Sequence, residues 1–208
     1  MTFKKRIAGA ATLGVAMLGS SLSAPPAQAA YIVTLAQVGG NVVATGSGAI
    51  DTAGLSVDGT RNTVAEIFTA ESTIITGPAS SEPTDVYTGV TGPAGPPGPM
   101  TLASSGSGDM VGILGADNLL FVPAGYVSGS PLMDSSTYDH QTLSSLGVPP
   151  GPGAFTYSFG SGANADTFTV KVEAAPVPEP ASLVLLGTGL LGLLMLRAPR
   201  HRRPTLSN

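Results

Sequence analysis

Several residue types on which enzymes commonly depend are missing or scarce in this 208-residue chain. It contains no cysteine and no tryptophan, and its only histidines are His140 and His201. Without cysteine the chain cannot form disulfides, thiolate metal sites or a cysteine nucleophile. A lone histidine in the central part of the chain also cannot supply a two-histidine metal site. These absences exclude several kinds of catalytic and metal centre.

Short motifs with a known chemical mechanism are missing as well. There is no Gly-x-Ser-x-Gly sequence, so the nucleophile elbow of α/β-hydrolases is absent. There is no Gly-x-x-x-x-Gly-Lys sequence, so a phosphate-binding loop of that type is not supported. The sequence therefore predicts a protein without enzymatic activity and without a required cofactor.

A small group of polar residues leaves two alternatives open. His140 follows Asp134, Ser135, Ser136 and Asp139, so a Ser-His-Asp arrangement with a distant partner is one alternative. A calcium site is the other, although no Asp-x-Asp-x-Asp-Gly loop supports it. The simpler interpretation is a polar loop histidine and solvated turn aspartates. The aspartates considered for calcium are Asp109, Asp117, Asp134 and Asp139.

Basic residues are almost absent from the middle of the chain. Between residues 30 and 180 there are thirteen acidic residues but only Arg61 and Lys171, a net charge of −11. Such a surface repels nucleic acids and anionic lipid headgroups. We therefore expect no nucleic-acid partner for this part of the protein.

The first 29 residues have the composition of a secretory signal peptide. Three basic residues at positions 4–6 precede an apolar stretch over residues 7–22. Ala27-Gln28-Ala29 then has the small-x-small pattern that signal peptidase accepts. We predict export by the Sec translocase and cleavage before Ala30.

The C-terminal thirty residues carry the most specific pattern. Pro178-Glu179-Pro180 precedes an uncharged apolar stretch over residues 181–196. A bilayer core needs ~20 helical residues, so the flanks must contribute to a single transmembrane helix. Cationic flanks stay cytoplasmic, so the preceding domain should face outward, with residues 197–203 as the basic cytoplasmic end. The arginines of this end are Arg197, Arg200, Arg202 and Arg203.

This order of a Pro-Glu-Pro motif, an apolar helix and a terminal arginine cluster resembles the PEP-CTERM sorting domain. The resemblance covers Val177 to Arg203 and implies a Gram-negative bacterium that makes exopolysaccharide. It also implies processing by an exosortase, a membrane-embedded enzyme similar to cysteine transpeptidases. By this resemblance Pro178, Glu179 and Pro180 form the element that the exosortase recognises.

Residues 30–176 have the short alternating runs of a mostly β protein. Residues 31–38 and 42–50 flank a Gly-Gly-Asn turn, and residues 63–70, 72–76, 110–114 and 119–122 are further strand candidates. Aromatic and β-branched residues alternate with polar ones over 155–159 and 167–172. We predict a single antiparallel β-sandwich or barrel-like domain, in which residues 141–146 form a short helix or turn.

Residues 89–100 depart from the strand pattern. They form four collagen-like triplets, Gly-Val-Thr, Gly-Pro-Ala, Gly-Pro-Pro and Gly-Pro-Met. Four triplets are too few to hold three chains in a triple helix, in which only glycine fits at the axis. We predict an extended polyproline-type surface loop, with a trimeric stalk as the alternative.

Taken together, the patterns predict a non-enzymatic protein that passes through the inner membrane to the periplasm, cell surface or extracellular matrix. By resemblance it would be associated with exopolysaccharide or biofilm. A carbohydrate-binding or adhesive module is the first alternative, with exposed tyrosines as its contacts. An envelope hydrolase is the second, because the spacing of a catalytic carboxylate pair is set by the fold. The candidate tyrosines are Tyr87, Tyr126 and Tyr138.

Overall fold

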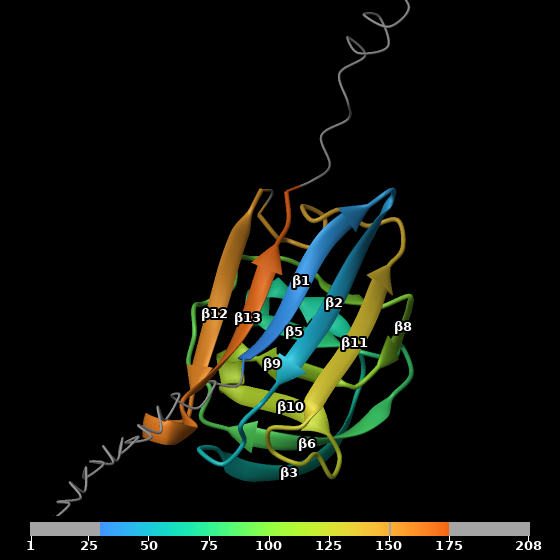
Figure 1. The fold of residues 1–208 in the computed structure, drawn as a ribbon. Coiled ribbons are helices and arrows are strands. Elements are labelled where there is room, and N and C mark those ends of the chain that lie inside the picture. Colours follow the sequence, from blue (N-terminus) through green and yellow to red (C-terminus); the bar gives the residue numbers. More distant parts are fainter. Residues whose placement is uncertain (1–29, 150, 175–208) are drawn as a thin grey trace, which may run out of the picture.

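The computed structural model describes residues 30–149 and 151–174, and these form two β-sheets packed face to face (Figure 1). The front sheet has six strands. In spatial order they are β12 (Gly153–Phe159), β13 (Asp166–Val172), β1 (Ala30–Val38), β2 (Asn41–Ala49), β11 (Pro131–Tyr138) and β8 (Ser105–Gly108).

The back sheet has seven strands, which run across the direction of the front strands (Figure 1). In spatial order they are β3 (Ser56–Thr63), β6 (Glu82–Thr88), β10 (Leu119–Pro123), β9 (Val111–Leu114), β5 (Thr73–Thr76), β4 (Glu66–Phe68) and β7 (Met100–Leu102). Three single 3-10 turns connect strands: η1 (Thr69–Glu71), η2 (Gly115–Asp117) and η3 (Gly162–Asn164). The predicted β-rich class is confirmed, and the two-sheet arrangement is that of a sandwich.

The core lies between the two sheets, and the alternation of side chains along each strand explains it. In β13 the side chains of Phe168, Val170 and Val172 are buried while the intervening ones face outward. The Phe168 ring packs on Tyr31 of β1, with 5.3 Å between ring centroids. One continuous cluster contains buried residues from both sheets, including Ile74, Ile113 and Leu120 of the back sheet. One hydrophobic core therefore holds both sheets together.

Three of the predicted strand pairs are present as hairpins. β1 and β2 pair antiparallel around Gly39-Gly40, and Gly39 has a φ of +60°, as a tight two-residue turn requires. β9 and β10 pair around η2, and β12 and β13 pair around the residues between the two alternating runs 155–159 and 167–172. Residues 143–147 form a turn rather than a helix, which is one of the two outcomes predicted for 141–146.

The sequence prediction was wrong on one pairing and incomplete for others. β1 and β13 pair parallel, with Ala30 opposite Thr167 and Leu35 opposite Val172, so the sheet is mixed rather than wholly antiparallel. Strands β3, β6, β8 and β11 and the three-residue β7 were not predicted. Residues 63–70 contain the last residue of β3, the three-residue β4 and the start of the turn η1. The missed strands are rich in Ser, Thr, Gly, Asp and Pro, which have weak strand preference or break strands in isolation.

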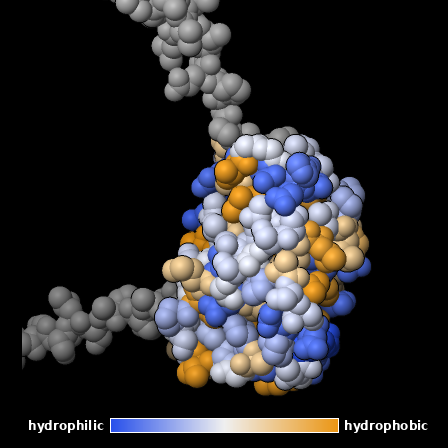
Figure 2. All heavy atoms as spheres, turned by 90° about the vertical axis from the view of Figure 1, so that its right-hand side faces the viewer, coloured by the Kyte–Doolittle hydropathy of each residue, from blue (hydrophilic) through white to orange (hydrophobic). Residues whose placement is uncertain are grey.

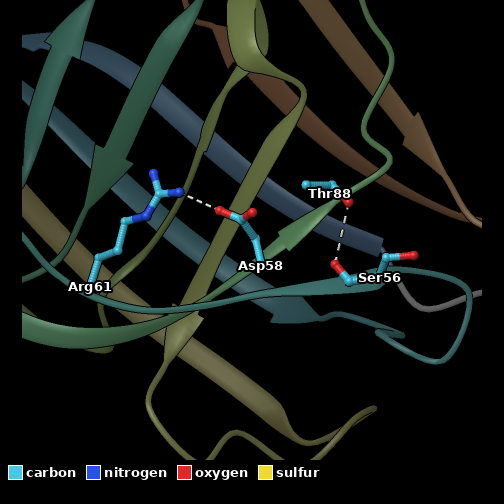
Figure 3. A network of polar contacts seen from close by, with 4 residues as sticks. All are labelled: Ser56, Asp58, Arg61 and Thr88. Atoms are coloured by element: carbon cyan, nitrogen blue, oxygen red, sulfur yellow. Dashed lines mark hydrogen bonds and ion pairs between the residues drawn. The ribbon is translucent and has the colours of Figure 1, made fainter.

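The edge strand β3 has two features that discourage pairing with other chains. Its register against β6 shifts between Val57 and Gly59, which leaves Asp58 as the extra residue of a β-bulge. The Asp58 carboxylate forms an ion pair with Arg61 on the same strand (Figure 3). A bulge and charged side chains are two ways in which natural sheets protect an edge, so we assign β3 a protective role.

The collagen-like segment is a strap, defined here as residues 89–99, that joins β6 to β7 across the domain. Thr91 makes two backbone hydrogen bonds with Ser158 at the edge of β12, at 2.7 and 2.9 Å. A Cβ on Gly92 would overlap the Tyr157 ring, one on Gly95 the Thr69 carbonyl, and one on Gly98 the Thr69 hydroxyl. Residues three apart share one side of a polyproline-type segment, so the glycine spacing serves contact with the domain itself.

Substituting alanine for Gly95 should therefore destabilise the domain by about 2 kcal/mol, because a buried backbone contact has no room for the added methyl group. Ala94→Ser, one residue earlier and exposed, is the control and should change the unfolding free energy by less than about 0.5 kcal/mol. Urea unfolding of the two variants measures both effects. Equal stability of the two would contradict the intramolecular role of the glycine spacing.

Two predicted segments fall outside the described residues. These are the signal peptide over residues 1–29 and the tail over residues 177–203. Across residues 30–149 and 151–174, no helix combines the length and hydrophobicity needed to cross a membrane. The predicted transmembrane span over 181–196 lies beyond them.

Candidate functional site

The β-sandwich fixes the point from which the C-terminal tail leaves it. β13 is held between β12 and β1, and the Glu173 amide donates a hydrogen bond to the Leu35 carbonyl at 2.9 Å. Backbone pairing therefore continues to one residue before Ala174, the last residue described. The sorting residues Pro178, Glu179 and Pro180 and the four predicted stop arginines lie outside the described residues.

The opposite end of the same strand pair contains the predicted mature N-terminus. Ala30 is the first residue of β1 and lies opposite Thr167, near the start of β13. Since the two strands run parallel, β1 begins at one end of the front sheet and β13 ends at the other (Figure 1). The predicted cleavage after Ala29 would thus fall immediately before the first strand; Ala27 and Ala29 themselves are not described.

A buried acid on β11 is the least expected polar feature of the core. Asp134 is 5% exposed, and its Oδ2 accepts a hydrogen bond from the hydroxyl of Tyr31, which is wholly buried. Its Oδ1 has no hydrogen-bond partner among the described residues. Burial raises the pKa of Asp134 to about 6, although the hydrogen bond from the Tyr31 hydroxyl opposes the increase. Burial and the nearby Asp134 also raise the pKa of the Tyr31 phenol.

A missing side chain on β2 makes room for this pair. Tyr31 lies on β1 and Asp134 on β11, and β2 separates these strands in the sheet. Gly46 of β2 lies opposite Asp134, and a Cβ there would approach both carboxylate oxygens and the Tyr31 hydroxyl to under 3 Å. Alternation along β11 would have indicated this site, because Asp134 shares its face with Leu132 and Tyr138.

A second polar cluster fastens the loop that follows β2. The Asp166 carboxylate accepts hydrogen bonds from the amides of Asp51 and Thr167 at 2.7 and 2.6 Å. The Asp51 carboxylate accepts bonds from the Ala53 amide at 2.9 Å and the Ser128 hydroxyl at 2.8 Å. Burial raises the pKa of Asp166 while its two backbone donors lower it. These carboxylates are occupied with backbone donors, and the cluster has the chemistry of a loop anchor.

The residues considered for a catalytic triad form hydrogen bonds with other groups and not with one another. The Ser136 hydroxyl is buried and bonds the Gly77 amide and carbonyl, each at 2.9 Å. His140 is exposed, and its backbone adopts a φ of +56°. Among the described residues no hydrogen bond joins the His140 ring to Asp134 or Ser136. The arrangement required of a triad is not formed.

The aspartates considered for calcium are dispersed as well. Asp109 accepts a hydrogen bond from the Met133 amide at 2.8 Å, Asp134 faces the core, and Asp117 and Asp139 are exposed in turns. Within residues 30–149 and 151–174 there is no group of three or more His, Asp or Glu side chains placed to hold a metal ion.

The three tyrosines considered for sugar contacts are largely committed to the fold. Tyr138 is fully buried, and Tyr87 is half-buried against the core. The Tyr126 hydroxyl donates to the Ser130 carbonyl at 2.7 Å and accepts from the Ile50 amide at 3.1 Å. These side chains pack and fasten loops, so they do not present a common aromatic surface.

Comparison with known proteins identifies the tail. The protein-family profile described as the PEP-CTERM protein-sorting motif matches residues 176–203. No curated protein and no solved structure matches the chain. The profile begins two residues after Ala174 and confirms the resemblance seen in Pro178-Glu179-Pro180 and the residues that follow. The chain therefore carries a PEP-CTERM sorting tail directly after its β-sandwich, which marks it as an exported protein sorted in the cell envelope by an exosortase-type enzyme.

Proposed function

We propose that the β-sandwich is a non-enzymatic surface or matrix domain that the PEP-CTERM tail delivers to the exopolysaccharide-rich exterior of the cell. The observation that carries the proposal is the sorting motif at residues 176–203, directly after a sandwich that is paired up to Glu173. The carboxylates of Asp51 and Asp166 each accept two hydrogen bonds that fasten a loop, and Asp134 is buried against Tyr31, so these three acids serve the fold. That use supports a binding or structural role over a catalytic one.

In this proposal the signal peptide is removed before Ala30, and residues 181–196 hold the protein briefly in the inner membrane. The exosortase-type enzyme then cuts near Pro178-Glu179-Pro180 and releases or transfers the domain. The strong excess of acidic residues in the body keeps it soluble and away from anionic lipid surfaces.

The test is the intact mass of the protein from membrane and extracellular fractions. We expect an extracellular species that begins at Ala30 and ends near the Pro178-Glu179-Pro180 motif. Glu179→Gln should shift the protein to the membrane fraction with residues 181–203 retained. Glu173→Gln, the same chemical change six residues earlier, is the matched control and should be processed normally.

A wild-type protein that keeps residues 181–203 in the membrane fraction would refute the processing step. Turnover of polysaccharide or ester substrates by the purified protein would refute the non-enzymatic role, provided that substituting one Asp, Glu or His abolished it.

A further inference from the structure

The outward face of the front sheet consists largely of hydroxyl groups. Alternation along each strand places one set of side chains inward and the other outward. The outward set contains hydroxyl residues and also the apolar Ile32, Val38, Val43 and Met133. The cross-strand neighbours Thr156 and Thr169 approach to 3.3 Å between hydroxyl oxygens, which confirms that both point outward. The outward hydroxyl residues are Thr34, Thr45, Ser47, Ser105, Ser107, Ser135, Thr137, Thr156, Ser158, Thr167 and Thr169.

These hydroxyls are aligned from strand to strand. Thr34 lies opposite Thr45, Thr45 opposite Ser135, and Ser135 opposite Ser107. Neighbouring strands are ~4.8 Å apart, and outward positions along a strand are separated by two residues of ~3.3 Å each. The face therefore presents a cross-strand row of hydroxyls over β1, β2, β11 and β8, which suits a partner with a repeating structure.

Charge is nearly absent from this face although the domain is strongly acidic. Residues 30–174 contain twelve acidic and two basic residues. Among the outward strand positions of the front sheet the charged residue is Lys171. The acidic side chains lie in the loops, on the back sheet or, as for Asp134 and Asp166, buried inside.

Part of this face forms an open, shallow depression, called the groove below. The groove has a volume of about 450 Å³ and is lined by residues 45–47 of β2, 107–108 of β8 and 133–135 of β11. The side of the molecule nearest β8 and β11 includes a pale area of intermediate hydropathy among the blue and orange residues (Figure 2).

The lining of the groove indicates the chemistry of its ligand. Thr45, Ser47, Ser107 and Ser135 supply hydroxyls, each able to donate and accept a hydrogen bond. The hydroxyls of Ser107 and Ser135 are 3.4 Å apart. Those of Thr45 and Ser47 make no hydrogen bond within the described residues and are free for a ligand. Met133 is 72% exposed beside them and offers an adaptable apolar contact.

We propose that this groove, defined by Thr45, Ser47, Ser107, Met133 and Ser135, binds a segment of an uncharged polysaccharide. Sugar hydroxyls match the donors and acceptors, and the C–H face of a sugar ring matches Met133. Phosphates and anionic polymers are disfavoured because the groove holds no cation and the domain around it is negative. The proposal deepens the proposed function by naming the partner class, and it rests on the surface location given there.

The test uses the full chain in a detergent free of sugar groups, with native affinity electrophoresis as the readout. The probes are dextran, galactomannan and hydroxyethyl cellulose as uncharged polymers and alginate as an anionic one. We expect retardation by at least one uncharged polymer and none by alginate. No retardation by any uncharged polymer, or retardation by alginate alone, would overturn the proposal.

Matched substitutions locate the binding on the face. Thr45→Val with Ser135→Ala removes two groove hydroxyls and should weaken binding about tenfold, because each net hydrogen bond contributes ~0.5–1.5 kcal/mol. Thr169→Val with Ser158→Ala makes the same changes on the same face but outside the groove, and should leave binding within about twofold. Equal losses in the two variants would overturn the groove assignment.

The outcome is separable from that of the sorting experiment. Correct sorting of a protein that binds no uncharged polymer would reject the groove while leaving the envelope role intact. Binding of an uncharged polymer by a protein whose tail is never processed would support the groove and reject the processing step. Thermal unfolding of each variant shows whether a loss of binding comes from a loss of folding.

Discussion

Replacing Gly46 with alanine is expected to destabilise the sandwich by about 4 kcal/mol. The new methyl group would approach the Tyr31 hydroxyl and both Asp134 oxygens to under 3 Å. Both partners are the ends of side chains, but the side chains of Tyr31 and Asp134 are buried, at 0% and 5% exposure. The substitution combines overpacking of ~1–3 kcal/mol with the loss of a buried hydrogen bond of similar cost.

The control for this prediction is Gly153→Ala in β12, where an added Cβ meets nothing within 4 Å. Urea unfolding should show a change below about 1 kcal/mol for this variant. Removing the Tyr31 hydroxyl first, with Tyr31→Phe, takes away one atom that the Gly46→Ala methyl group overlaps. The two changes should therefore cost less together than the sum of the single variants. Strict additivity would refute the packing explanation.

Replacing Asp134 with asparagine should make the protein relatively more stable as the pH rises. The pKa of Asp134 is raised from the ordinary 3.8 to about 6 in the folded state, so folding favours the protonated acid. Below about pH 4 the acid is protonated in both states and carries no penalty. Between about pH 4 and pH 6 it ionises in the unfolded chain first, and stability falls.

The free-energy difference between Asp134→Asn and the wild type should therefore grow by about 3 kcal/mol from pH 4 to pH 7, in favour of the variant. Urea unfolding at a series of pH values measures it. Glu66 and Asp166 also have pKa values that burial raises. They change the stability of the wild type and of the variant by the same amount at each pH, so the difference between the two proteins isolates Asp134. The exposed Asp117→Asn is the control. A difference that is constant with pH would contradict the buried, ionisable role of Asp134.

Sequence patterns were informative where hydrophobic side chains alternate in an uninterrupted run. Residues 155–159 and 167–172 have aromatic and β-branched residues at every second position, and they lie in β12 and β13. The strand candidates 110–114 and 119–122 leave a gap that contains Gly115 and Asn118, two residue types that favour turns, and Asn118 adopts the left-handed conformation with a φ of +60°.

The patterns were uninformative where tertiary contacts decide the structure. β8 consists of Ser-Gly-Ser-Gly and is a strand only because β11 pairs with it. β11 has a regular inward face, but that face contains Asp134 and Ser136 in place of hydrophobic residues. The partners that make those polar residues tolerable, Tyr31 and Gly77, are distant in sequence. The hydroxyl-rich groove could not be predicted either, since its three strands come from separate parts of the chain.

The parallel pairing of β1 with β13 has a consequence for how the chain crosses a membrane. In the folded sheet β13 lies between β12 and β1. A chain that crosses the membrane N-terminus first therefore cannot complete this sheet until residues 166–172 have emerged. Pairing β13 with β1 costs conformational entropy, because it brings together segments more than 130 residues apart in sequence, such as Ala30 and Thr167. β13 is thus the last strand to emerge, and its pairing with β12 and β1 completes the sheet. The sorting motif follows it within a few residues. A chain truncated before β13 would lack both the strand that completes the sheet and the sorting motif.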